Sequence, residues 1–198
     1  YVVINRDKLQ NVLNSRFGSC FTYIQKGRYL EPQKDGSLLS DLGDETLYSF
    51  LLQHRDGQSL APEVIEYYQK VIRQLPMIQM TGKQGLDFSV AYPRQAFDRQ
   101  SMQWDLNYFK YYFVKLSKIT FDEQKLENDF QTLMDKLLQC DSDFFLYRDF
   151  QSRNIMIHDG EVYFIDYQGG RKGSFFYDIA SLLFDGKADL PFELRESL

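Results

Sequence analysis

Cysteine and histidine are scarce in this chain, with two of each among 198 residues. Cys20 and Cys140 stand far apart and belong to no Cys-x-x-Cys motif. A disulfide between them stays open, but two free thiols in a reducing compartment are the simpler interpretation, so we expect a cytoplasmic protein. His54 and His158 lack the spacing of metal ligands.

Long apolar runs and excess positive charge are also missing. No run approaches the length of a membrane span, so we expect no membrane partner. The first residues, YVVINRDKLQ, become charged almost at once, so we expect no signal peptide, and the lack of a starting Met indicates a natural N-terminus elsewhere. The formal net charge of −5 argues against nucleic acid as a partner, because nucleic acid favours a basic face. It leaves room for a nucleotide, whose phosphates a metal ion can meet.

Aromatic residues are abundant, and 17 Phe and 14 Tyr can bury enough area to make disorder unexpected. Sequence patterns predict a helical region from 45 to 140. Its first helix begins near Glu45, with Asp44 as the N-cap. The second begins near Pro62 and repeats apolar residues at helical spacing, at Val64, Ile65, Tyr68, Val71, Ile72 and Leu75.

Three more helices are predicted further along the chain. One runs from Met102 to about Ser117 and is strongly aromatic. A final, buried helix is predicted for YDIASLLFD. The helix between them begins at a capping box of Thr120 and Glu123 and carries apolar residues on one face, at Leu126, Phe130, Leu133, Met134, Leu137 and Leu138.

A β-hairpin is predicted for NIMIHDGEVYFID, which follows a short strand at 144–146. Asp159-Gly160 is a strong type I′ turn signal between two runs of β-forming residues. A two-residue turn at this position pairs His158 with Glu161 and fixes the register of the remaining pairs.

Two oxygen-bearing side chains meet at the open end of this hairpin. Counting back from the turn pairs Asn154 with Ile165 and makes Asp166 the diagonal neighbour of Asn154, whereas a one-residue bulge would put the two directly opposite. In both registers an amide oxygen and a carboxylate come together, which suits Mg²⁺ with phosphate oxygens and water as its other ligands. Asp149, on the loop that enters the hairpin, can accept a proton from a hydroxyl beside the metal.

The spacing of these residues matches a kinase catalytic loop, H-R-D-x-x-x-x-N, followed by a metal-binding Asp. Here the loop reads YRDFQSRN from Tyr147 to Asn154, and Asp166 follows 12 residues after Asn154. The alternative is that Asp149 and Asn154 only stabilise a tight loop and that Asp166 ends a strand.

Three segments resemble the aminoglycoside phosphotransferase family: GSLLSDLGDETLYSFL, FLYRDFQSRNIMI and YFIDYQGGRKGSFFYDIASLL. Within it they are most similar to bacterial anomeric kinases, which phosphorylate N-acetylmuramate or N-acetylglucosamine at C1. The resemblance covers about 36–198 and implies an α+β, protein-kinase-like fold. A small β-rich N-terminal lobe and hinge would occupy 1–42, and a larger, mainly helical lobe carrying the catalytic hairpin would occupy 43–198.

The resemblance also implies roles for individual residues. The catalytic base would be Asp149, and the Mg²⁺ ligands would be Asn154 and Asp166. Asp178 would brace the catalytic loop by hydrogen bonds, with a helix N-cap as the alternative. The adenine of ATP would meet backbone groups of the hinge at Ser40, Asp41 and Leu42.

Arg148 and the pair Trp104-Asp105 are further candidates. Arg148, grouped with the catalytic residues, is either a cation that braces the loop, which is the favoured interpretation, or a phosphate contact. In the resembling kinases the region of Trp104 and Asp105 borders the sugar pocket, where an aromatic face suits sugar C–H groups. Ordinary core packing is the favoured alternative for this pair. Arg153 faces either solvent or substrate.

Two features depart from the family. Tyr147 stands where the family usually has His. The 39 residues before the hinge are about half of a kinase-like small lobe and show no Gly-rich loop. Their lysines (Lys8, Lys26 and Lys34) lack a V-A-I-K context, so we expect part of the lobe to be absent and assign no phosphate-binding Lys.

These observations favour an ATP- and Mg²⁺-dependent kinase for a small-molecule hydroxyl, in particular an amino sugar at its anomeric position. The alternatives are a nucleotide-binding or interaction module that has lost catalysis, and a kinase for an aminoglycoside or another small alcohol. A protein kinase is less favoured, because the 11 residues between Asp166 and Asp178 leave no room for an activation loop. The oligomeric state stays open.

Overall fold

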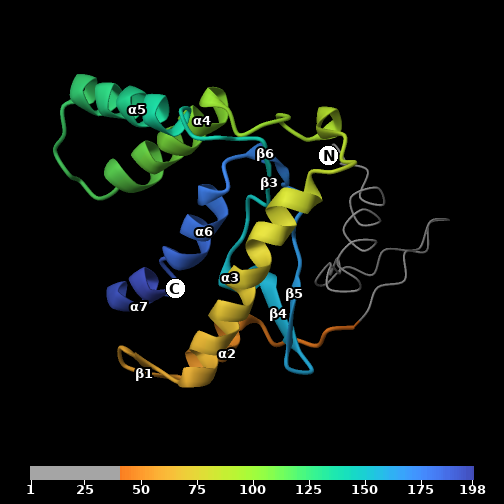
Figure 1. The fold of residues 1–198 in the computed structure, drawn as a ribbon. Coiled ribbons are helices and arrows are strands. Elements are labelled where there is room, and N and C mark those ends of the chain that lie inside the picture. The colour runs from red at the N-terminus through yellow and green to blue at the C-terminus, as the bar shows by residue number, and fades with distance from the viewer. Residues whose placement is uncertain (1–40) are drawn as a thin grey trace, which may run out of the picture.

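The computed structural model describes residues 41–198, which combine helices with short antiparallel strand pairs (Figure 1). The predicted small lobe and Ser40 of the hinge lie outside the described residues, and the domain boundary near residue 42 stays a prediction. Among residues 41–198, no helix combines the length and apolar character needed to cross a membrane. Cys140 is a free thiol, and Cys20 is outside the described part.

Helix α2 spans Leu47–Gln53 and begins two residues later than expected. The predicted N-cap, Asp44, is wrong, and Thr46 caps the helix instead. The Thr46 hydroxyl accepts the backbone N–H of Ser49 at 3.0 Å, and the Ser49 hydroxyl accepts the N–H of Thr46 at 2.8 Å. This reciprocal capping box satisfies two N–H donors that a single cap at Asp44 would leave unbonded.

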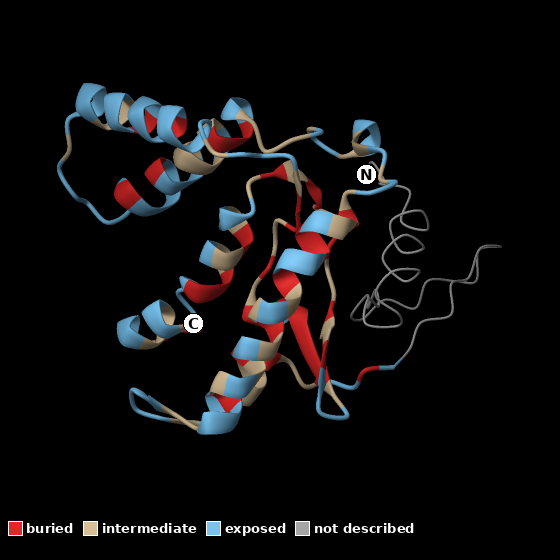
Figure 2. Ribbon diagram, viewed as in Figure 1, coloured by how far each residue is buried: buried red, intermediate tan, exposed pale blue. Residues whose placement is uncertain are grey.

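Helix α3, Pro62–Gly82, supplies one wall of the hydrophobic core. Pro62 stands in its first turn, as predicted. Figure 2 shows that α3 buries the side that faces the strands and exposes the other. Between α2 and α3, strands β1 (Arg55–Asp56) and β2 (Ser59–Leu60) form a small unpredicted hairpin. The predicted stripe of α3 is confirmed at its fully buried positions, Val64, Tyr68, Val71 and Leu75, and continues to Ile78.

Helices α4 (Arg99–Phe109) and α5 (Glu123–Leu137) project from the core as an antiparallel hairpin (Figure 1). α4 begins three residues before the predicted start and continues as a π-helical turn, η3, at Lys110–Val114. The predicted capping box at Thr120 is wrong, because the Asp122 carboxylate accepts the N–H of Lys125 at 2.9 Å and begins the helix there. On α5 only Phe130 and Met134 are buried, so the predicted apolar face is partly exposed.

The strands form two further antiparallel pairs. β3 (Phe144–Leu146) pairs with β6 (Arg171–Gly173), and β4 (Ile155–His158) pairs with β5 (Glu161–Phe164). Two short helices follow, α6 (Phe176–Leu183) and α7 (Phe192–Ser197).

The predicted register of the β4–β5 hairpin is confirmed. His158 pairs with Glu161, and the turn residues Asp159 and Gly160 have φ values of +50° and +77°, as a type I′ turn requires. At the open end Ile165 N–H donates to Asn154 O at 3.1 Å. The regular register therefore holds, and the alternative with a bulge is wrong.

Candidate active site

The loop between β3 and β4 closes around the backbone carbonyl of Asp149. This oxygen accepts the N–H of Gln151 at 2.9 Å and the side-chain amide of Asn154 at 2.8 Å. The short 3-10 helix η4 (Ser152–Asn154) then leads into β4. Both hydrogen bonds involve the backbone of Asp149, so its position is held while its half-buried carboxylate stays available for chemistry.

Burial and neighbouring charges act on the pKa of the Asp149 carboxyl. Burial and, next, the negative charge of Asp166 raise the pKa of the Asp149 carboxyl. Three cations act in the opposite direction: Arg148, Arg153 and Arg171. A carboxylate whose pKa is raised is a better proton acceptor than an ordinary aspartate.

Asp178, on the first turn of α6, is fully buried and binds the backbone of the catalytic loop. It accepts the N–H of Tyr147 at 2.8 Å and the N–H of Arg148 at 3.0 Å, the two residues before Asp149. Gln79 of α3 donates to the same carboxylate at 2.9 Å. Burial raises the pKa of Asp178 to about 6, although these three hydrogen bonds act in the opposite direction.

Tyr147 ties the catalytic loop to the strand that ends before Asp166. Its hydroxyl donates to the backbone carbonyl of Ile165 at 2.6 Å. Its fully buried ring packs edge-on against Phe145, Phe150 and Tyr167. Tyr147 therefore combines a packing role with a hydrogen bond between the two segments that carry the candidate site.

The guanidinium of Arg148 contacts a carboxylate, a hydroxyl and two aromatic rings. Its guanidinium forms two parallel hydrogen bonds of 2.7 Å to the carboxylate of Asp105 in α4, and it donates to the hydroxyl of Tyr177 at 2.6 Å. It also stacks over the rings of Phe97 and Tyr177. These contacts favour the interpretation of Arg148 as a bracing cation. They also favour Asp105 as its ion-pair partner over Asp105 as a substrate contact. We name the Asp105–Arg148–Tyr177 group the loop clamp.

The oxygens predicted to bind Mg²⁺ lie at the open end of the hairpin. Because the Asn154 amide nitrogen donates to Asp149 O, the amide is oriented and its carbonyl oxygen is left for another partner. Asp166 has a φ of +68° and accepts a hydrogen bond from Gln168. The Gln168 carbonyl oxygen is buried and accepts no hydrogen bond from residues 41–198, so a further unused oxygen lies beside Asp166.

This donor set fits magnesium. It consists of oxygens alone, and a few protein oxygens plus phosphate and water are the usual ligands of Mg²⁺ in a nucleotide site. Within the described residues, no cluster of three or more His, Cys, Asp or Glu could hold a metal without such help.

The other residues predicted for the site differ in their exposure to solvent. Asp41 is exposed and accepts the N–H of Gly43 at 2.9 Å, while Leu42 is buried. Trp104 is 45% exposed, so its alternative interpretation as a core residue is wrong. Arg153 is exposed beside the catalytic loop.

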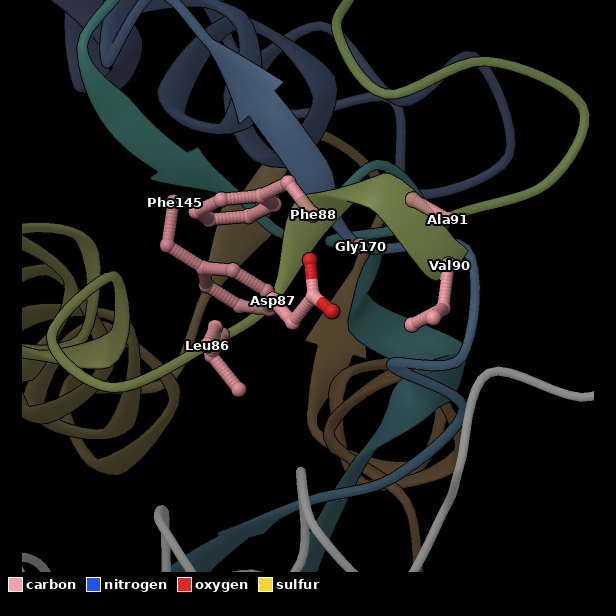
Figure 3. A pocket seen from close by; sticks show the side chains of 7 residues that line it. All are labelled: Leu86, Asp87, Phe88, Val90, Ala91, Phe145 and Gly170. Carbon is pink, nitrogen blue, oxygen red and sulfur yellow. The ribbon is translucent and has the colours of Figure 1, made fainter.

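A shallow apolar hollow lies next to the candidate site but is separate from it. Figure 3 shows the Phe145 ring and Gly170 among its walls. A Cβ on Gly170 would lie 2.5 Å from carbons of the Phe145 ring, so only glycine fits there. None of Asp149, Asn154 and Asp166 lines the hollow.

Several residues of the site carried no sequence signal. Gln79, Tyr177 and Gln168 contact Asp178, Arg148 and Asp166 respectively, but none belongs to a spacing pattern. Gln79 alone could have been suspected, because it is a polar residue next to the apolar stripe of α3.

The model of the phosphotransferase enzyme family matches residues 28–198 of the chain. The chain is also 28% identical, over 152 residues, to a protein of Neisseria meningitidis serogroup B (strain ATCC BAA-335 / MC58) named N-acetylmuramate/N-acetylglucosamine kinase. The match covers 75% of this chain and 42% of that protein, so the chain spans less than half the length of this relative.

The bracing role of Asp178 can be tested by thermodynamics. We expect Asp178→Asn to lower the free energy of unfolding by about 1–3 kcal/mol, because the amide turns an NH₂ group toward a backbone N–H and leaves it unsatisfied. Urea unfolding followed by circular dichroism measures the change. Asp141→Asn is the matched control, since Asp141 also accepts a backbone N–H but on an exposed turn, and we expect a change within about 0.5 kcal/mol. Equal effects in the two variants would contradict the bracing role.

Proposed function

The chain belongs to the phosphotransferase enzyme family, and on that premise we propose that it carries the catalytic lobe of an ATP-dependent kinase for a small-molecule hydroxyl. The observation that carries the proposal is the oriented catalytic loop. Asp149 is held through its backbone, and Asn154 and Asp166 lie at the hairpin end beside it. Kinase chemistry consists largely of positioning and charge neutralisation, which this arrangement can supply.

In this proposal Asp149 is the base. Its half-buried carboxylate accepts the proton of the acceptor hydroxyl, and its raised pKa suits that task. Asp178 and the loop clamp act as positioning groups. Asp178 binds the backbone N–H groups of the two residues that precede Asp149, and Asp105 and Tyr177 bind the side chain of Arg148.

Asn154 and Asp166 would hold Mg²⁺ in the complex with ATP. When bound, the ion would neutralise the phosphate charge beside Asp149. The oriented amide of Asn154 and the unused oxygen of Gln168 support this assignment. The hinge segment that includes Ser40, Asp41 and Leu42 is proposed for adenine.

For the acceptor we propose an N-acetylated amino sugar, phosphorylated on its anomeric hydroxyl. The similarity to the Neisseria protein named N-acetylmuramate/N-acetylglucosamine kinase supports this substrate class. The exposed ring of Trp104 offers an apolar face of the kind that sugar C–H groups use. Asp105 is not assigned to the substrate, because Arg148 occupies both of its oxygens.

The alternatives have less support. A polycationic aminoglycoside needs several free carboxylates, yet Asp143 is already paired with Lys83 and Lys172, which lower the pKa of this carboxyl to about 2. A module without catalysis would have no need to keep Asp149, Asn154 and Asp166 together. A peptide substrate is disfavoured because β6 and α6 follow Asp166 with no long segment between them.

The role of Asp149 is tested by replacing only its charge. We expect Asp149→Asn to reduce kcat at least about 10²-fold and to leave the Kd for ATP nearly unchanged, because the base acts on the acceptor. Phosphoryl transfer from ATP to N-acetylglucosamine and ATP binding are measured separately. Asp159→Asn is the control, because Asn tolerates the positive φ of that exposed turn. Near-normal turnover of Asp149→Asn would rule out the assignment.

The metal ligands are tested by titrating Mg²⁺ at constant ATP. We expect Asp166→Ala to raise the Mg²⁺ concentration at half-maximal rate more than Asn154→Ala does, because Asp166 contributes a full negative charge. Asp159→Asn should titrate like the parent. The metal site would be wrongly assigned if both alanine variants kept the midpoint of the parent.

The acceptor position is tested by the chemistry of the product. A phosphate on the anomeric oxygen is acid-labile, whereas a phosphate on another sugar hydroxyl is stable, so mild acid should release label from the product of [γ-³²P]ATP. N-acetylglucosamine and N-acetylmuramate are the substrates, and Asp149→Asn supplies the blank. Acid-stable product would exclude the anomeric position, and turnover with aminoglycosides alone would exclude the substrate class.

A further inference from the structure

Two arginines lie at the candidate active site, the half-buried Arg148 and the buried Arg171, and they differ in their partners. Arg148 is neutralised by the paired oxygens of Asp105. Arg171, the first residue of β6, is only 7% exposed but has no carboxylate partner within residues 41–198. The difference matters because a buried charge is costly unless it is paired.

The hydrogen bonds of Arg171 go to backbone oxygens. Its Nε donates to Gly169 O at 3.0 Å, and its Nη2 donates to Tyr92 O at a long 3.4 Å. A guanidinium has five N–H donors, so these two bonds use only part of its capacity and provide no direct ion pair. Burial and, next, the charge of Arg148 accordingly lower the pKa of Arg171.

Arg171 belongs to the immediate surroundings of the base. A Cβ on Gly169, the residue whose carbonyl Arg171 holds, would lie 3.6 Å from a carboxylate oxygen of Asp149. Arg171 also interacts electrostatically with Asp149, Asp105 and Tyr177. A buried guanidinium without a carboxylate ion pair among residues 41–198 therefore acts electrostatically on the Asp149 carboxylate, and it is hydrogen-bonded to the backbone of Gly169 beside it.

We propose that Arg171 binds an oxyanion of the molecules that react at Asp149. A guanidinium favours phosphate and carboxylate oxygens because its N–H groups match their geometry. The oxyanion comes either from the transferred phosphoryl group or from an acidic group on the acceptor, and the two sources have different kinetic signatures. The inference rests on the proposed kinase function, but its first test does not need turnover.

The first test measures anion binding without nucleotide or sugar. Inorganic phosphate is titrated into the parent, Arg171→Met, Arg171→Lys and Arg55→Met at constant ionic strength, with calorimetry as the readout. Arg55 is the matched control, because its guanidinium also donates to two backbone carbonyls, of Ala188 and Asp189, on a different segment. We expect Arg171→Met to weaken phosphate binding at least about tenfold, the scale of lost charge-assisted hydrogen bonds, with Arg171→Lys in between and Arg55→Met unchanged.

Phosphate binding by Arg171→Met as tight as by the parent would overturn the proposal, and so would an equal loss in Arg55→Met. Thermal unfolding of all four proteins separates binding from stability. If Arg171→Met does not fold, Arg171→Lys decides, since it keeps the charge but cannot reach both carbonyls in the same way.

The second test identifies the source of the oxyanion. N-acetylmuramate carries a carboxylate that N-acetylglucosamine lacks. An equal loss of kcat with both sugars in Arg171→Met indicates the phosphoryl group, and a rise in KM confined to N-acetylmuramate indicates the acceptor carboxylate. Unchanged kcat and KM for both sugars would contradict the proposal. Failure of the parent to phosphorylate any acceptor would instead count against the proposed function, while the phosphate titration still tests Arg171.

Discussion

The candidate site depends on one buried carboxylate that accepts two consecutive backbone N–H groups. Asp178 holds Tyr147 and Arg148 at the same time, which requires both N–H groups to point to one side of the chain. Arg148 meets this requirement with a φ of +84°, a conformation that costs energy for a residue with a side chain. The hydrogen bonds to Asp178 offset that cost, and they place Asp149 at the next position along the chain.

The same carboxylate joins three parts of the fold. Asp178 comes from α6, Gln79 reaches it from α3, and the catalytic loop supplies the backbone donors. Tyr147 extends the connection to Ile165, one residue before Asp166. Asp149 and Asp166, which are 17 positions apart in the sequence, are thus held by one buried network, whose members stabilise each other at low local dielectric.

The projecting helices are connected to this network through charge. Asp105 of α4 neutralises Arg148. The α4–α5 helix pair, which would face an acceptor in the proposed function, therefore also helps to orient the loop that carries Asp149. Arg171 forms no ion pair with a carboxylate among residues 41–198, and its hydrogen bonds go to two backbone oxygens instead.

Local features of the fold could be predicted from short stretches of sequence. Turn chemistry at Asp159-Gly160 decided the hairpin register, and helical spacing decided the buried face of α3, because both depend on residues close together in the chain. At the start of α2 two residues could serve as the N-cap. Thr46 caps the helix in place of Asp44, although Asp is the more common N-cap residue, since only Thr46 has Ser49 as a reciprocal partner.

Which side chains meet across the molecule depends on the packing of its elements. Asp105 and Arg148 are 43 positions apart, and Gln79 and Asp178 are 99 apart, so no spacing rule could pair them. The same holds for exposure: Trp104 is hydrophobic enough for a core, but α4 projects from the body and leaves it in solvent. Burial and long-range pairing depend on how elements pack against each other, and that information is absent from any short stretch of sequence.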